Sequence, residues 1–182
     1  MYKKILDEAI QELKYDEFGE LFKDESPASF FKETMIDTDF EVLIPDSYIE
    51  NVEERLILYN KLNRIFTEKE LKKFESELID RFGKIPSHTS DLLDLIRIKW
   101  KATRFGIEKL NLKKNKLKAF FPYKHAKNNQ FQTHIFEKLL RYVKNNFHTC
   151  KFQEEAKGLY IYINEVDSIE HALKIFSDID AS

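Results

Sequence analysis

Glu77, Asp80 and Arg81 are charged residues at positions i, i+3 and i+4 of a segment whose apolar residues recur at helical spacing. Side chains at these positions share one face of a helix, so the three charges would lie together. Held by a packed helix, they could form a docking face for a partner. They could equally be a solvated surface with an intrahelical Glu77–Arg81 pair, worth less than about 0.5 kcal/mol. The pattern alone leaves both interpretations open.

The sequence lacks the residue patterns that catalysis or cofactor binding requires. A phosphate-binding loop needs clustered glycines, whereas the four glycines here are scattered: Gly19, Gly83, Gly106 and Gly158. The histidines have no metal-ligand spacing with one another or with Cys150; they are His88, His125, His134, His148 and His171. Cys150 lies in a predicted strand, where we expect a small core residue and not a nucleophile. We therefore expect this chain to have no enzyme activity, metal or cofactor of its own.

Composition favours one soluble domain, or one domain with an appendage. The chain has 182 residues, of which 42% are hydrophobic, and this is enough to build a core. A single cysteine excludes an internal disulfide and fits a reducing compartment. No apolar run approaches the length of a membrane span, and the N-terminal segment is amphipathic, unlike a signal peptide. We expect a cytoplasmic protein that contacts no membrane.

Charge is unevenly distributed, although the net charge is only −2. Residues 101–151 hold thirteen Lys or Arg against Glu108 and Glu137, about +11, whereas residues 1–25 and 164–182 each carry about −4. Six lysines cluster around a predicted hairpin: Lys113, Lys114, Lys116, Lys118, Lys124 and Lys127. They could contact a phosphate backbone, so a nucleic-acid-binding module is the alternative function. A lysine-rich hairpin can also simply protect a sheet edge from aggregation.

Apolar periodicity and capping residues predict a helical N-terminal half. A helix is expected over 2–14, and a short strand over 37–45. Three more helices are expected: one capped by Asn51, one opened by a Thr67–Glu70 capping box and ended by a left-handed cap at Gly83, and one over about 87–105.

The apolar period then changes to that of strands. The stretch KLNLKKNKLKAFF predicts a hairpin that turns at Lys114 and Asn115, and CKFQEEAKGLYIYI predicts a second hairpin around Gly158. Helices are expected over 128–146 and after Asp167 or Ser168. The predicted fold class is α+β, with a helical N-terminal half followed by a small, mostly antiparallel sheet packed with helices.

Three stretches of the central segment have a distinctive order and spacing: IPDSYIENVEERLILYNKL (44–62), ELIDRFGKIP (77–86) and LLDLIRIKWKATRFGIEKL (92–110). In both respects they resemble the C-terminal domain of the bacterial transcription-repair coupling factor, Mfd. YKKILDEAI, near the N-terminus, resembles the family's helix that follows the motor module. The resemblance implies that residues 1–36 are a helical linker from that module, and that 37–182 form the C-terminal regulatory domain.

The resemblance implies a fragment of a protein of transcription-coupled nucleotide-excision repair. In this family a UvrB-like module recruits UvrA, a middle module binds RNA polymerase, and an ATP-driven motor walks on DNA. The C-terminal domain folds back on the UvrB-like module and hides its UvrA-binding face. ATP and Mg would serve the motor of the parent, an ATP-dependent DNA translocase, and not this fragment.

The resemblance also bears on the three charges of the central segment. Glu77, Asp80 and Arg81 match family residues that contact basic and aromatic residues of the UvrB-like module. It therefore favours a docking face over a solvated surface.

Overall fold

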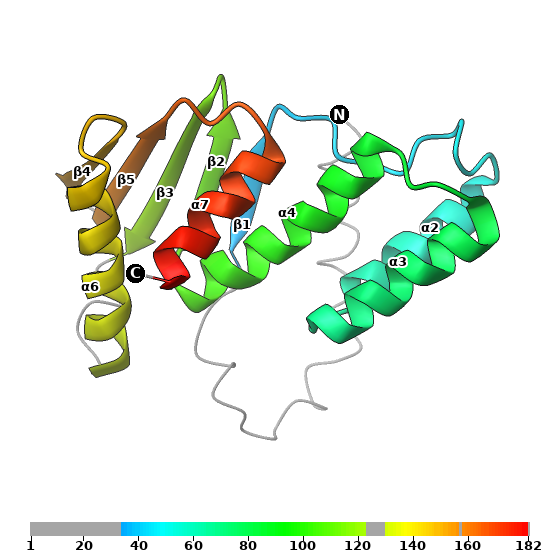
Figure 1. The fold of residues 1–182 in the computed structure, drawn as a ribbon, viewed down its shortest axis with the longest axis horizontal. Helices are drawn as coiled ribbons and strands as arrows, with labels where there is room; N and C mark the ends of the chain where they lie inside the picture. Colours follow the sequence, from blue (N-terminus) through cyan, green and yellow to red (C-terminus); the bar gives the residue numbers. More distant parts are fainter. Residues whose placement is uncertain (1–33, 123–129, 157, 182) are drawn as a thin grey trace. The chain divides into compact units, whose positions relative to one another are not determined.

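The computed structural model of the chain describes residues 34–122, 130–156 and 158–181 (Figure 1). The chain divides into two units, Met1–Phe31 and Lys32–Ser182, and every described residue belongs to the second. The helix predicted over 2–14 lies outside the described residues. Among the helices that are described, none is both long and apolar enough to cross a lipid bilayer.

Three of the described helices precede most of the sheet: α2 (Val52–Asn63), α3 (Glu68–Phe82) and α4 (Ser87–Arg104). The first two begin at the predicted caps. The Asn51 side chain accepts the Glu54 N–H at 3.1 Å, and Thr67 and Glu70 form a reciprocal capping box. Each cap satisfies backbone donors that would otherwise lack a partner, so local sequence signals fix where these helices begin.

The sheet has five strands in the order β1-β2-β3-β5-β4. Their bounds are β1 (Met35–Thr38), β2 (Lys109–Lys113), β3 (Lys116–Pro122), β4 (Cys150–Glu155) and β5 (Gly158–Asn164). β1 runs parallel to β2, and the other neighbouring pairs are antiparallel. The remaining described helices are α6 (Gln130–Asn145) and α7 (Ile169–Ala181). The predicted α+β class with a mostly antiparallel sheet is confirmed.

The β2–β3 hairpin turns where the sequence predicts. Lys114 and Asn115 have φ angles of 52° and 57°, as a two-residue turn needs when its twist matches that of the flanking strands. Of the two residues predicted to cap α7, Ser168 is the one whose side chain accepts the His171 N–H, at 3.1 Å.

The strand predicted over 37–45 is wrong beyond Thr38, where β1 ends. The Asp39 N–H still donates to the Leu112 carbonyl of β2, at 3.3 Å. Further along, a side chain holds the backbone, because the Ile44 N–H donates to the Tyr59 hydroxyl at 2.7 Å. Val42 is buried in the core beneath the sheet, and Ile44 is buried in a separate core among the helices. The alternating apolar residues therefore serve two cores and not one face of a strand.

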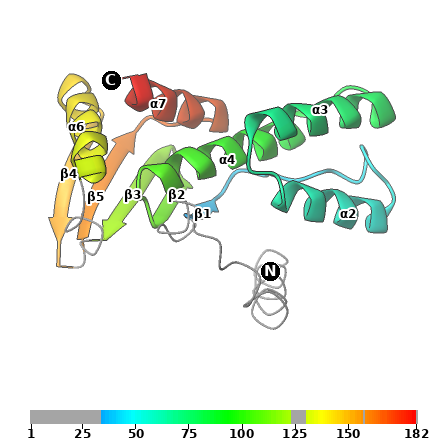
Figure 2. The ribbon, with the colours of Figure 1, turned by 90° about the horizontal axis from the view of Figure 1, so that it is seen from below.

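These two hydrophobic cores share helix α4. The first lies between the sheet and helices α4, α6 and α7, which cover the same face of the sheet (Figures 1 and 2). The second is built by α2, α3 and the N-terminal half of α4. Leu92 contacts both cores, and Lys101 pairs with Asp180 of α7 at 3.0 Å. Helix α4 therefore couples the helical half to the sheet.

Candidate docking surface

Helix α3 holds the three predicted charges on its outer side. Its inner side packs into the second core through residues that are at most 1% exposed: Leu71, Phe74 and Leu78. This buried stripe fixes how the helix is rotated about its axis. Glu77 is consequently half-buried at the edge of the stripe, whereas Asp80 and Arg81 are exposed.

Two of the three charges pair with helix α2. Glu77 accepts a hydrogen bond from Lys61, and Arg81 donates one to Glu54. Arg81 Nη1 also lies 3.9 Å from Glu77 Oε1, so the intrahelical pair exists as a longer contact. These side chains remain 31% to 46% exposed, and exposed pairs contribute little stability. Their main effect is to orient the charged groups across the α2–α3 boundary.

Glu77 and Asp80 have different electrostatic surroundings. The hydrogen bond from Lys61 holds the pKa of Glu77 below its ordinary value despite the opposing effect of partial burial, and the charges of Lys61 and Arg81 act in the same direction as the hydrogen bond. The Asp80 side chain makes no hydrogen bond or ion pair with the part of the chain that the structure describes. Asp80 is therefore available to an external partner without losing an internal one.

Aromatic packing and a glycine fix the C-terminal end of α3. The Tyr48 hydroxyl donates to the carbonyls of Gly83 and Leu78, at 3.0 and 3.2 Å. The Tyr48 and Phe82 rings meet edge to face at 5.9 Å, and the Arg81 guanidinium lies 4.8 Å from the Phe82 ring centre. Gly83 has the predicted positive φ, 80°, but its ψ of −155° lies outside the left-handed helical region. That conformation is essentially restricted to glycine.

A hollow of about 380 Å³ opens beside these charges, lined by Asn51, Glu53, Glu54, Ile57, Leu58 and Arg81. Ile57 is 66% exposed, so it adds an apolar contact next to Arg81. Glu54, Ile57 and Lys61 were not predicted from the sequence, because a helical wheel of α3 does not show its neighbours on α2. The available signal was that α2 carries apolar residues on more than one side.

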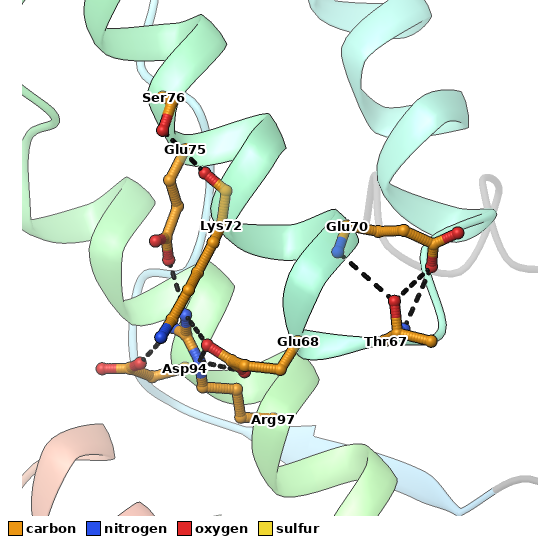
Figure 3. A network of polar contacts seen from close by, with 8 residues as sticks. All are labelled: Thr67, Glu68, Glu70, Lys72, Glu75, Ser76, Asp94 and Arg97. Carbon is orange, nitrogen blue, oxygen red and sulfur yellow. Dashed lines mark hydrogen bonds and ion pairs between the residues drawn. The ribbon is translucent and has the colours of Figure 1, made fainter.

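On its other side, α3 is tied to α4 by Arg97 (Figure 3). The Arg97 guanidinium lies 2.9 Å from Glu68, 2.7 Å from Glu75 and 2.8 Å from Asp94. Partial burial alone would lower the pKa of Arg97, but the hydrogen bonds to Glu68 and Glu75 outweigh it and raise that pKa. Arg97 is therefore permanently charged, and it fixes the angle between the two helices.

Replacing Arg97 with Met is expected to reduce the free energy of unfolding by about 2 kcal/mol near pH 7. Breaking a fully buried ion pair typically costs about 3–5 kcal/mol. We expect a smaller cost for Arg97, because its side chain is 18% exposed and solvent screens its ion pairs. Urea denaturation of both proteins measures the loss. Lys69→Met, at an exposed position of α3, is the control and should change stability by less than about 0.5 kcal/mol.

The loss of unfolding free energy caused by Arg97→Met should be smaller at acidic pH than at neutral pH. The hydrogen bond from Arg97 lowers the pKa of Glu68 in the folded state. Ionised Glu68 therefore stabilises the fold at pH values above the pKa it has in the unfolded chain. This contribution disappears as the pH falls through the folded-state pKa of Glu68. Burial raises the pKa of Asp94, and Arg97 opposes that rise. Without Arg97 both carboxyls bind protons more readily in the folded state. The stability difference between the wild type and Arg97→Met should therefore be smaller near pH 4 than near pH 7. An equal difference at the two pH values would contradict the role of Arg97 as the partner of these carboxylates.

The structure describes four of the six lysines named for the alternative function: Lys113, Lys114, Lys116 and Lys118. Lys124 and Lys127 lie outside the described residues. Lys113 pairs with Asp37 of β1 at 2.6 Å, which neutralises part of the positive charge at that edge. Lys118 lies on β3 among aromatic side chains, with its ammonium 4.1 Å from the Tyr160 ring centre. The described hairpin lysines therefore do not form one uniform basic cluster, because Lys113 pairs with a carboxylate and Lys118 lies against an aromatic ring.

The described residues contain no group of three or more His, Cys, Asp and Glu side chains placed to hold a metal ion. Cys150 is buried, and burial raises the pKa of its thiol in spite of a hydrogen bond with Thr149. Cys150 belongs to the first hydrophobic core, which confirms the prediction that it is a core residue.

The fold matches that of a solved domain. It matches the crystal structure of a C-terminal domain of transcription-repair coupling factor with a TM-score of 0.65, over 83% of this chain and 94% of that chain. The two sequences are 16% identical, so this similarity shows a common fold alone.

The sequence identifies the family. A family model described as the TRCF domain matches residues 38–132, which is more than half of the 182-residue chain. The chain therefore belongs to the TRCF domain family, as the central motifs predicted.

Two curated relatives show the extent of the similarity. The transcription-repair-coupling factor of Rickettsia conorii is 31% identical over 162 residues, 87% of this chain and 14% of that protein. The one of Escherichia coli is 34% identical over 110 residues, 60% of this chain and 9% of that protein. The chain thus spans at most 14% of the length of these two relatives.

Proposed function

We propose that this chain is the C-terminal regulatory domain of an ATP-dependent DNA translocase in transcription-coupled nucleotide-excision repair. In this proposal it docks on a UvrB-like module of the same cytoplasmic polypeptide and masks the UvrA-binding face of that module. Family membership supports the setting. The observation that carries the docking surface is the fixed, outward placement of Glu77, Asp80 and Arg81 on α3.

The chemistry of this surface suits a partner that presents basic and aromatic groups. Asp80 and the ionised Glu77 offer carboxylates to cations, and charge-assisted hydrogen bonds of this type are the strong ones. Arg81 offers a guanidinium that lies against the Phe82 ring and can stack on a further aromatic ring. Ile57 supplies apolar area in the adjoining hollow. The surface therefore combines charge recognition with an apolar contact.

The same proposal assigns a separate role to each module of the parent protein. Residues 37–182 form the regulatory domain, and 1–36 link it to the motor module. The motor binds ATP and Mg and contacts DNA, while UvrA and RNA polymerase interact with other modules. The isolated domain is not an enzyme in this scheme, because its sequence has no glycine-rich phosphate loop.

Changing Glu77, Asp80 and Arg81 together to Ala in the full-length parent is expected to increase its affinity for UvrA about tenfold. If the domain covers the UvrA-binding face about 90% of the time, only about a tenth of the molecules can bind, and releasing the domain restores the rest. Fluorescence anisotropy or calorimetry with purified UvrA measures the change.

The control is Glu170→Ala with Lys174→Ala, two exposed charges four residues apart on α7. The control should leave UvrA affinity unchanged. A triple variant with unchanged UvrA affinity and an unchanged melting temperature would show that the three charges only contact solvent.

A further inference from the structure

Helices α4, α6 and α7 cover one face of the sheet, and no described element covers the other (Figure 2). Successive residues of a strand point to opposite faces. Ala119 and Ile161 are buried beneath the helices, so their neighbours along β3 and β5 point to the uncovered side. We call this side the open sheet face, and its central residues are Lys118, Phe120, Lys151, Tyr160 and Tyr162.

An aromatic strip crosses the open sheet face. Strand register places Phe120 opposite Tyr160, with their ring centres 4.8 Å apart, and Tyr160 lies 6.2 Å from Tyr162. Gly158 allows this arrangement, because a Cβ at that position would lie 2.7 Å from Phe120 Cε2 and 2.2 Å from the Phe121 carbonyl oxygen. All three rings are half-buried, so they expose part of a flat apolar surface although no described helix packs on them.

Lysines surround the aromatic strip. The Lys118 ammonium lies 4.1 Å from the Tyr160 ring centre and 5.0 Å from that of Tyr162, while Lys151 lies 5.3 Å from Tyr162. The register adds three more lysines to the same face, namely Lys109, Lys113 and Lys116. The acids that the register places on this face are Asp37 and Glu155. The open sheet face therefore carries a positive charge around its aromatic centre.

From this arrangement we infer that the open sheet face binds single-stranded nucleic acid. Bases stack on Phe120, Tyr160 and Tyr162, and the surrounding lysines contact phosphates. Base–aromatic stacking tolerates any sequence, and a basic surface along the backbone completes the binding mode known for single strands. A duplex cannot use the aromatic strip, because its bases already stack on one another. An acidic protein would use the lysines but would leave the rings without a role.

Lys118 links the two kinds of contact. Its hydrogen bond with Tyr162 raises its pKa, despite the opposing effect of burial, so the ammonium stays charged while it lies over the rings. A base that stacks on Tyr160 must displace this ammonium, and a phosphate of the same strand offers it a new partner. The docking surface on α3 belongs to the other core, so this inference stands independently of the proposed docking.

The test is fluorescence anisotropy of the whole chain with labelled oligothymidylate and oligouridylate of about twelve nucleotides, at about 50 mM salt. Lys118→Glu with Lys151→Glu should weaken binding at least about tenfold, and so should Tyr160→Ala with Tyr162→Ala. Lys144→Glu with Lys174→Glu, at exposed positions of α6 and α7, makes the same charge change on the opposite side and should cost less than about twofold.

Two further measurements separate stacking from charge. Tyr160→Phe with Tyr162→Phe keeps the rings and should keep wild-type affinity within about twofold. Affinity should fall with salt at a slope of about −3 on logarithmic axes, as expected when four or five lysines each neutralise a phosphate of a single strand. The DNA and RNA probes tell which backbone is preferred, and a preference for either one supports the inference.

Several results would contradict binding of single-stranded nucleic acid at the open sheet face. The inference is overturned by an absence of binding at about 50 mM salt, or by glutamate and alanine variants that bind as well as the wild type. It is also overturned if polyglutamate competes as effectively as the oligonucleotide, because the partner would then be an acidic protein. Should the alanine variant fail to fold, ultraviolet crosslinking of the wild type decides: crosslinks in β3 and β5 support the inference, and crosslinks confined to other segments contradict it.

Discussion

Replacing Phe74 with Ala is expected to reduce the free energy of unfolding by about 3–5 kcal/mol, the usual cost of deleting a fully buried aromatic side chain. Phe74 is 1% exposed and lies in the second core between Leu71 and Leu78 of its own helix and the residues of α2 and α4. The rigid neighbours of such a site cannot fill the cavity completely. Urea denaturation at neutral pH gives the loss directly.

The matched control is Ile79→Ala on the same helix. Ile79 is 54% exposed, so its truncation should cost less than about 1 kcal/mol, since little apolar area leaves a buried environment. Both variants alter α3, and only one removes the packing that orients it. Equal and small losses would mean that α3 is not anchored as described, and the charges on its outer side would then lack a fixed geometry.

The Phe74 change should also affect the charges on the surface. The Lys61 ammonium lies 5.8 Å from the Phe74 ring centre and pairs with Glu77. A folded Phe74→Ala protein therefore loses part of what holds Lys61 in place. Its docking should weaken even at temperatures where the fold survives.

Helix α3 was predictable because its determinants are local. Thr67 and Glu70 satisfy each other's backbone donors at one end, and Gly83 supplies the positive φ at the other. The apolar stripe between them follows one helical period. The same reasoning explains why the turn at Lys114 and Asn115 was found, since its two residues alone determine the backbone twist.

The partners of Glu77 and Arg81 were not predictable, because they depend on how two helices pack. Helix α2 has no single apolar face: Leu58 is buried, while Leu56 and Ile57 are exposed. A wheel of α2 therefore does not show which side meets α3. The ion pairs with Lys61 and Glu54 emerge only when both helices are placed in space.

The error over residues 37–45 has a related cause. Alternating apolar residues are typical of a strand with one buried face, yet Val42 and Ile44 are buried in different cores. The pairing of β1 with β2 joins segments that are far apart in the sequence, and it is parallel. Local patterning does not encode which distant strand a short segment will join.

Loss of docking is the second large effect that we expect. If the domain docks as proposed, its tether within the parent keeps its effective concentration near the UvrB-like module on the order of 1 mM. A separate-chain Kd near ~0.1 mM therefore suffices to cover the UvrA-binding face about 90% of the time. In the proposed mechanism, a contact this weak can still be released when the motor engages.

The three side chains should contribute unequally to that contact. Truncating a charged group that is desolvated at an interface costs about 1–3 kcal/mol. Glu77 and Arg81 already form ion pairs with α2. A docking partner must compete with these internal pairs, which reduces the net contribution of Glu77 and Arg81 to docking. Asp80 has no partner among the described residues. Asp80→Ala is therefore expected to be the most damaging single change, and the triple variant should bind at least about a hundredfold more weakly.

The most direct test of the docking surface is an NMR titration of this chain with the separately produced UvrB-like module of its parent. We predict a Kd near ~0.1 mM for the wild type, with chemical shift changes centred on Asp80 and Arg81. The triple alanine variant should show no saturable binding up to about 1 mM, whereas the α7 control of Glu170→Ala with Lys174→Ala should bind like the wild type. Equal binding by the wild type and a correctly folded triple variant, or no binding by the wild type, would contradict the proposal.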